Sequence, residues 1–240
     1  MSPVNPNDRI VWIDCEMTGL DLGADALIEV AAVVTDSELN VLGEGVDVLI
    51  TPPEGAIEQM GDFVREMHTT SGLLEELPGG TTMADAQARV LDYIRTWVPE
   101  PGKAPLAGNS VGTDKTFLER DMPDLVRHLH YRIVDVSSIK ELARRWYPRV
   151  YFASPAKTGG HRALGDILDS IDELRYYREA LFLPQPGTDS RTAKAIAERI
   201  KETSVGTTLG TIVAPEPASA VRPVDGAPGA APTAAAEKLS

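Results

Sequence analysis

Residues 10–20 have the sequence Ile10-Val11-Trp12-Ile13-Asp14-Cys15-Glu16-Met17-Thr18-Gly19-Leu20. A short apolar run that ends at a turn signal is typical of a strand buried on both faces, although a buried helix segment has the same hydrophobicity. In a strand, Asp14 and Glu16 project from one face, because successive side chains alternate. Two adjacent carboxylates repel each other, so the pattern indicates either a divalent-cation site or a polar strand end that meets water.

The composition is that of an ordinary soluble globular protein, with 240 residues, 42% hydrophobic and 25% charged. No apolar run approaches the roughly 20 residues that a membrane span requires, and the N-terminal residues have no secretory-signal pattern, so we expect a cytoplasmic protein without a membrane partner. The formal net charge of −13 argues against a long nucleic-acid track, which needs a basic surface. A short anionic substrate is compatible with a few locally placed cations.

Cys15 is the single cysteine of the chain, so no internal disulfide forms, and a reducing compartment is expected. Because Cys15 lies between Asp14 and Glu16, strand alternation predicts that its thiol points to the opposite, core side. A packed thiol is therefore expected here, not a nucleophile.

The apolar periodicity of the rest of the chain predicts an α/β fold, with a mixed sheet flanked by helices in one domain over residues 1–203. About half of residues 214–240 are Ala or Pro, and we expect residues 204–240 to form a disordered Ala/Pro-rich tail. Short helices and loops are expected over 56–77, and a loop over 148–160. Further strands are expected over 26–35, 41–50, 104–108 and 132–136, and helices over 82–98, 113–120, 124–130, 137–146, 163–183 and 188–202.

Three later residues bear on the first carboxylate pair. Asp114 follows a short strand and a polar turn, where an acidic residue also suits the N-terminus of an ordinary helix. His161 and Asp166 begin the late helix after two glycines, where a histidine by itself is typical of a surface residue or a cap. Taken singly, each of these residues has an ordinary structural explanation.

Taken together, Asp-x-Glu on a first strand, a middle Asp, and His-x(4)-Asp on a late helix resemble the DEDD exonucleases, in the variant whose general base is a histidine. The resemblance extends to the oligoribonuclease family, covers roughly residues 8–182 and implies a ribonuclease-H-like sheet. The motifs that carry it are Trp12-Ile13-Asp14 with Glu16-Met17-Thr18-Gly19-Leu20, Gly108-Asn109-Ser110, His130-Tyr131-Arg132, Asp135-Val136-Ser137 with Lys140-Glu141-Leu142-Ala143-Arg144-Arg145-Trp146, and His161-Arg162-Ala163 with Asp166-Ile167.

The resemblance implies two divalent cations, Mg²⁺ or Mn²⁺, held by the four carboxylates Asp14, Glu16, Asp114 and Asp166. Hard cations prefer oxygen ligands, which agrees with four carboxylates and no cysteine ligand. The family's arrangement implies that His161 takes the proton from the attacking water. Histidine suits this role because its side chain titrates near neutral pH.

The resemblance also implies how substrate is held. Leu20 would wedge between two bases, with Phe63, where the family usually has tryptophan, and His68 nearby. Ser110 would cap the 5′ phosphate together with His130, Tyr131 and Arg132 of a second subunit, so a homodimer with a shared active site is implied. Without the resemblance, a solvated loop before a strand would be the preferred explanation of residues 130–132.

We therefore predict a 3′→5′ exoribonuclease that acts on very short RNA, chiefly dinucleotides. One alternative is a DEDD exonuclease of other length specificity, of the proofreading or tRNA-trimming type. Another is a non-catalytic nucleotide-binding module on a nuclease fold, although all five residues of the reaction centre are present.

Overall fold

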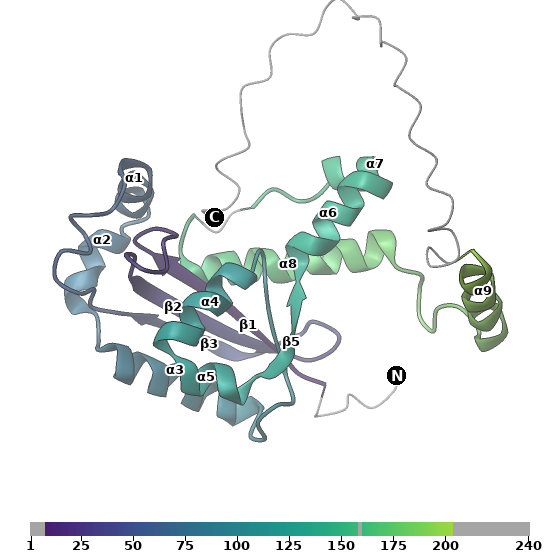
Figure 1. Ribbon diagram of the computed structural model, residues 1–240, viewed down its shortest axis with the longest axis horizontal. Helices are drawn as coiled ribbons and strands as arrows, with labels where there is room; N and C mark the ends of the chain where they lie inside the picture. The colour runs from purple at the N-terminus through teal and green to yellow at the C-terminus, as the bar shows by residue number, and fades with distance from the viewer. Residues whose placement is uncertain (1–7, 158–159, 204–240) are drawn as a thin grey trace, which may run out of the picture. The chain divides into compact units, whose positions relative to one another are not determined.

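A five-stranded mixed sheet lies at the centre of the residues that the computed structural model describes, 8–157 and 160–203 (Figure 1). Its strand order is β3-β2-β1-β4-β5. The first three strands form an antiparallel meander, whereas β4 and β5 run parallel to β1. The strands are β1 (Ile10–Met17), β2 (Leu27–Thr35), β3 (Val41–Leu49), β4 (Pro105–Gly108) and β5 (His130–Asp135). The predicted α/β fold with a mixed sheet and flanking helices is confirmed.

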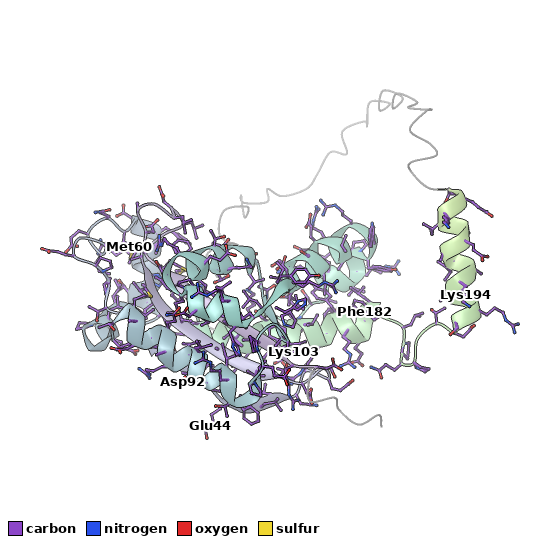
Figure 2. The ribbon with its side chains drawn as sticks, turned by 60° about the horizontal axis from the view of Figure 1, so that its bottom comes forward. Glu44, Met60, Asp92, Lys103, Phe182 and Lys194 are labelled. Carbon is purple, nitrogen blue, oxygen red and sulfur yellow. The ribbon has the colours of Figure 1, made fainter. Side chains whose placement is uncertain are left out.

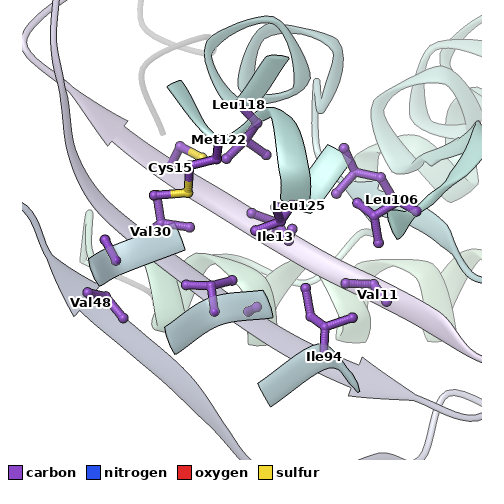
Figure 3. Close-up of a cluster of buried hydrophobic side chains, with 14 of the residues drawn as sticks. Val11, Ile13, Cys15, Val30, Val48, Ile94, Leu106, Leu118, Met122 and Leu125 are labelled. Carbon is purple, nitrogen blue, oxygen red and sulfur yellow. The ribbon is translucent and has the colours of Figure 1, made fainter. Parts of the chain in front are cut away.

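The odd-numbered residues of β1 face one layer of helices, made of α3 (Met83–Trp97), α4 (Gly112–Asp121) and α5 (Pro123–His128). Val11, Ile13 and Cys15 pack there against side chains such as Leu118 and Met122 (Figure 3). Cys15 is buried in this cluster, so its predicted core-side orientation is confirmed.

The even-numbered residues of β1 face the other layer, made of α8 (Ala163–Leu181) and α6 (Val136–Trp146). Trp12 is fully buried there, and its indole Nε1 donates a hydrogen bond to Thr35 Oγ1 at 3.0 Å. Strand alternation then places Asp14 and Glu16 on this same face, toward α8. The sheet thus separates an apolar core on one side from a face that becomes polar at the end of β1.

A small helical lobe follows β3 and contains α1 (Asp62–Thr70), α2 (Leu73–Glu76) and the 3₁₀ helix η1 (Leu77–Gly79). Its apolar side chains, among them Met67 and Leu73, form a separate small core on Ile28 of β2. The short helices predicted over 56–77 are therefore confirmed, and the lobe lies near the carboxyl end of β1 (Figure 1).

Residues 148–160, predicted as a loop, instead include the short helix α7 (Pro148–Phe152). Proline is well suited to the first position of a helix, because its missing N–H would have no partner there. Tyr176 of α8 donates a hydrogen bond from its hydroxyl to Val150 O at 2.8 Å, which ties this turn to the long helix. This tertiary contact has no signature in the local sequence.

The chain forms two compact units, the first ending at Leu181 and the second beginning at Phe182. In the second unit, α9 (Ser190–Glu202) is capped by Asp189, whose Oδ1 accepts from Thr192 N at 3.0 Å, and none of its residues is buried. The single-domain assignment over 1–203 stays a prediction, and the predicted disordered tail lies outside the described residues. No described helix has both the length and the apolar character of a membrane span.

Trp12→Ala tests the packing of the α8 face. Removal of a fully buried indole leaves a cavity and an unpaired Thr35 hydroxyl, so we expect the free energy of unfolding to fall by about 3–5 kcal/mol in urea titrations. Phe152→Ala is the control, because its ring is 83% exposed, and we expect a change within about 0.5 kcal/mol. Equal effects of the two substitutions would contradict the described core.

Candidate active site

Three carboxylates from two elements meet at the carboxyl end of β1. Asp14 and Glu16 project from the strand, and Asp166 lies in the first turn of α8. One oxygen from each lies within 4.8 Å of the other two. The structure therefore brings together three of the four predicted metal ligands.

Asp114 joins the site from α4, beside β1. The short strand β4 pairs with β1 only at Val11 and Trp12, so the β4-facing edge of β1 is open farther along. There Cys15 N donates a hydrogen bond to Asp114 Oδ1 at 3.1 Å. Asp114 is buried next to the site, but it is not part of the 4.8 Å cluster, and its role as a ligand stays a prediction.

The electrostatics of these carboxylates favour protonation in the absence of a cation. Burial, followed by the charges of the neighbouring carboxylates, raises the pKa of Asp14 well above its ordinary value. Burial is also the main cause that raises the pKa of Glu16 to about 9, that of Asp114 to about 7, and that of Asp166. A positive charge among these groups would offset the repulsion.

The donor set fits a hard divalent cation. Asp166 Oδ2 is buried and has no hydrogen-bond partner among the described residues, although it lies in the carboxylate cluster. Buried oxygens of this kind are normally satisfied, so a bound cation is a physical explanation for the orphaned atom. All the predicted ligands are carboxylates, and hard cations prefer such oxygen ligands.

His161 lies at the entrance to α8, one turn before Asp166. Its backbone adopts a left-handed conformation, with φ of 59°, directly after Gly160 with φ of 67°. The imidazole Nδ1 is buried without a hydrogen-bond partner in the part of the chain that is described. Burial, the largest effect, raises the pKa of Asp166, and the charges of Lys157 and then His161 partly offset this rise. His161 and Asp166 are therefore close enough to interact electrostatically. The role of general base stays a prediction.

His68 reaches the site from the helical lobe. Its imidazole is fully buried, and its Nε2 lies 2.9 Å from Met17 O. Because a carbonyl oxygen only accepts, Nε2 carries the proton, and burial lowers the pKa of His68 and favours the neutral ring. Nδ1 then turns its lone pair toward Glu16 Oε2 at 3.9 Å. His68 thus contacts the protein itself, and its predicted substrate contact is untested.

Leu20 and Phe63 are exposed apolar residues at this end of the sheet, 45% and 53% exposed. The loop that carries Leu20 is held by Asp25, which accepts from Thr18 Oγ1 at 2.9 Å and from Asp21 N at 2.8 Å. Leu20 is therefore presented on an ordered turn, which suits the predicted contact with a base.

Ser110 follows β4 in a left-handed conformation, with φ of 53°. Its N–H donates to Asp135 Oδ1 and to Ser137 Oγ, both at 2.9 Å, and its hydroxyl lies 3.1 Å from that of Ser137. Ser137 was not among the site residues predicted from the sequence. Its position could have been inferred from the sequence, because Ser137 follows the strand that neighbours β4, and parallel strands bring their carboxyl ends together.

The carboxylates lie away from three predicted substrate-binding residues of the same chain, His130, Tyr131 and Arg132. Val11, Leu106 and Ile133 are in register across β1, β4 and β5, so Asp14 is three residues beyond this line while Arg132 is one residue before it. This offset of four residues separates Asp14 from Arg132 by about 13 Å along the strand direction. The two residues also lie two strands apart in the sheet. The structure does not bring these three residues to the site of their own chain.

The sequence matches the RNase_T family, described as exonuclease, over residues 11–174. It is 73% identical over 194 residues to the oligoribonuclease of Streptomyces griseus, a match that covers 81% of this chain and 96% of the relative. The chain belongs to the oligoribonuclease family. The oligoribonuclease of Cutibacterium acnes is 64% identical over 190 residues and is matched over 94% of its length. The family resemblance inferred from the motifs is thus confirmed.

A solved exonuclease I from Methylocaldum szegediense has the same fold over 72% of this chain, with a TM-score of 0.54 and 19% identity. The match covers 41% of that longer chain. This likeness supports the ribonuclease-H-like sheet. Because the identity is only 19%, it supports the fold and nothing further.

Metal-free stability should depend on pH in a defined direction. The site carboxyls have raised pKa values in the folded chain, so the folded state binds more protons than the unfolded state. Their stabilisation is full below the ordinary values of 3.8 and 4.5, and is lost as pH rises through about 7 for Asp114 and about 9 for Glu16. We expect the melting temperature without metal to fall between pH 5 and pH 9, and saturating Mg²⁺ or Mn²⁺ to reverse most of the fall at high pH.

Asp14→Asn removes one of the repelling charges, so it should raise the metal-free melting temperature at pH 8. About 1 kcal/mol corresponds to roughly 2–4 °C in a chain of this size. The matched control is Asp92→Asn, because Asp92 points outward from α3 and its side chain is 76% exposed (Figure 2). A lower melting temperature for Asp14→Asn, or equal shifts in both variants, would contradict carboxylate repulsion at the site.

Proposed function

We propose that this chain is a 3′→5′ exoribonuclease that hydrolyses very short RNA, dinucleotides above all. The observation that carries the proposal is the meeting of Asp14, Glu16 and Asp166 beside His161, in a chain closely similar to oligoribonucleases. The exonuclease family match covers all of these residues.

We propose two Mg²⁺ or Mn²⁺ ions as the cofactors, held by Asp14, Glu16, Asp166 and Asp114. When bound, such a pair lowers the pKa of a water and stabilises the charge that develops on the phosphate and the leaving oxygen. The four carboxylates would hold the positive charge of the cations in a largely buried place, where electrostatic interactions are strong. Asp114 would be oriented by its hydrogen bond from Cys15 N.

His161 would accept the proton of the attacking water. Its imidazole is electrostatically coupled to Asp166 and has an unused buried nitrogen, Nδ1, among the described residues. A neutral imidazole accepts a proton readily near neutral pH, which suits it to general-base catalysis.

Substrate length would be limited by contacts at the two ends of a short pocket. Leu20 and Phe63 offer exposed apolar surface for the bases, while the hydroxyl of Ser110, which lies beside that of Ser137, offers a hydrogen bond to a phosphate. The net charge of −13 disfavours binding of a longer polyanion by general attraction.

A second copy of the chain would complete this pocket. β5 is an edge strand, and exposed apolar side chains gather on it and on the adjoining helix α6, where Trp146 is 65% exposed. Exposed patches of this kind mark interaction surfaces. A two-fold dimer across this edge would move His130, Tyr131 and Arg132, which lie away from their own carboxylates, toward those of the partner. The side chain of Arg132 is already oriented by Tyr131, whose hydroxyl accepts from Arg132 Nε at 3.1 Å.

We also propose a cytoplasmic location. Cys15 is a free, buried thiol in a chain with no other cysteine, which agrees with a reducing compartment.

The first test is hydrolysis of a labelled RNA dinucleotide with and without Mg²⁺ or Mn²⁺. We expect activity that a chelator abolishes, and a loss of at least about 100-fold in kcat for His161→Ala with metal and substrate affinity retained. Asp92→Asn serves again as the surface control. Metal-independent turnover, or full activity of His161→Ala, would contradict the mechanism. A matched series of longer RNA strands tests length specificity. If they are cut as fast as the dinucleotide, the result would favour an exonuclease that accepts a broader range of lengths.

Mixing two inactive variants tests the shared pocket. Arg132→Ala should weaken dinucleotide binding strongly, because a charge-assisted pair of hydrogen bonds to phosphate is lost, while Asp14→Asn should stop hydrolysis. In a mixed dimer, the intact carboxylates of the Arg132→Ala subunit meet the intact cap residues of the other subunit, so partial activity should return. No recovery, despite subunit exchange shown by native mass spectrometry, would contradict the shared pocket.

Gly19→Ala tests the loop that presents Leu20. A Cβ at Gly19 would lie 2.4 Å from Asp25 Oδ2, so Asp25 must move and release Thr18 and Asp21. We expect the KM for a dinucleotide to rise by roughly 10-fold, about 1.4 kcal/mol, with kcat nearly unchanged. Gly79→Ala is the control, because nothing lies within 4 Å of its Cβ position. An unchanged KM for Gly19→Ala would show that this loop does not set binding.

A further inference from the structure

We propose that Arg162 is a positioning residue for His161, and that Glu29 and Glu76 hold it in place. This inference deepens the proposed function and rests on it, because it concerns how the residue that accepts the proton is fixed at the carboxylate site. Nothing in the sequence motifs distinguishes Arg162 from an ordinary residue beside a catalytic histidine.

The guanidinium of Arg162 is held by two carboxylates from different parts of the fold. Its Nε donates to Glu29 Oε1 on β2 at 2.9 Å, and its Nη2 lies 2.8 Å from the same oxygen. On its other side, Nη1 and Nη2 donate to Glu76 Oε1 and Oε2 at 3.1 and 2.9 Å. The planar fork of arginine suits such bidentate pairing, which fixes orientation as well as position.

Glu29 is the buried half of this arrangement. Its side chain is fully buried and lies opposite Glu16 in the β1–β2 register. Its second oxygen, Oε2, accepts from Ala163 N at 3.1 Å, at the N-terminus of α8. A buried carboxylate is stable only when it is paired and hydrogen-bonded, so Glu29 anchors both Arg162 and the start of the helix.

The conformation of His161 explains why an anchor is needed. Its left-handed backbone, with φ of 59°, is unfavourable for a residue with a Cβ. Such a conformation persists only when neighbouring contacts determine it. Arg162 and Ala163 are the next two residues, and both are fixed by Glu29. Release of this anchor would let the imidazole leave its place beside Asp166.

The contacts also argue against a role for Arg162 as a phosphate ligand. Nε, Nη1 and Nη2 all donate to carboxylates, so the guanidinium has no nitrogen that is left without an acceptor. Glu76 belongs to the lobe that carries Phe63 and His68. Arg162 therefore joins the sheet, the lobe and the His161 segment at one point.

The first experiment is a double-mutant cycle in the full-length protein with a labelled dinucleotide and Mn²⁺. Arg162→Gln should lower kcat by about 10-fold or more with KM within about twofold, because misplacement of a catalytic group by about 1 Å has effects of this size. In a His161→Ala background, the same substitution should change the residual rate by less than about twofold, because a residue that acts through His161 has nothing left to position.

Two matched variants accompany it. Arg178→Gln, on α8 itself, is the control, because Arg178 also pairs with a carboxylate, Glu38, but twelve residues beyond Asp166, about 18 Å along the helix. It should leave kcat and KM unchanged. Arg162→Lys keeps the charge beside Glu29 but loses the fork, so it should restore folding and part of kcat if Arg162→Gln is unstable.

The second experiment needs no activity. Amide hydrogen exchange over residues 160–167 of the metal-free protein should become faster in Arg162→Gln and stay unchanged in Arg178→Gln. If the wild-type protein does not cut dinucleotides, the proposed function fails, and this exchange measurement still decides the positioning role. Equal kcat losses with and without His161, a raised KM with normal kcat, or unchanged exchange would each overturn the inference.

Discussion

The mutual repulsion of carboxylates at the end of β1 is the constraint on which the rest of this structure depends. Asp14, Glu16 and Asp166 lie within 4.8 Å of one another, and Glu29 lies opposite Glu16 on the next strand. Without partners, such a group of acids opposes folding, because burial and like charges both disfavour ionisation. The fold holds them with a rigid strand and the first turn of a packed helix, and Glu29 accepts a hydrogen bond from Ala163 N. In the proposed function, a cation supplies the remaining compensation.

The contacts around the site form two polar systems on opposite sides of the carboxylates. On one side, Arg162 joins Glu29 of the sheet to Glu76 of the helical lobe. On the other, Asn109 Nδ2 donates to Ser170 Oγ on α8 at 2.9 Å, and Asn109 Oδ1 accepts from Ser137 Oγ at 3.1 Å. Glu29 also accepts from Ala163 N at the start of α8, so both systems reach the helix that supplies Asp166. The position of this helix is therefore determined by polar contacts at its functional end and by apolar packing along the rest of its length.

Sequence reasoning was most successful where a local pattern determines the outcome. The strand over β1 follows from its apolar run, and the shared face of Asp14 and Glu16 follows from the two-residue period of a strand. Asp166 and His161 were instead identified through the resemblance of the combined motifs to the DEDD exonucleases, because each residue taken singly has an ordinary structural explanation. For the strand and its two carboxylates, the information lies within a few residues of the site.

It failed where the outcome depends on residues distant in sequence. Ser137 lies beside Ser110 only because β4 and β5 are parallel neighbours. The burial of His68 depends on packing of the lobe against β1, and the pairing of Arg162 with Glu29 joins residues 133 positions apart. The short helix α7 was missed because its tie to Tyr176 is also a tertiary contact.

The orientation of Cys15 has a consequence for which metals the site accepts. A thiolate between Asp14 and Glu16 on the same face would add a soft sulfur ligand and favour zinc or copper over harder ions. Strand alternation instead places the sulfur among Leu118 and Met122 on the far side of the sheet, where burial raises the pKa of the thiol well above its ordinary value. The thiol is thus both protonated and out of reach. At the proposed metal site, one residue of strand register therefore separates a donor set of oxygens alone from one that includes sulfur.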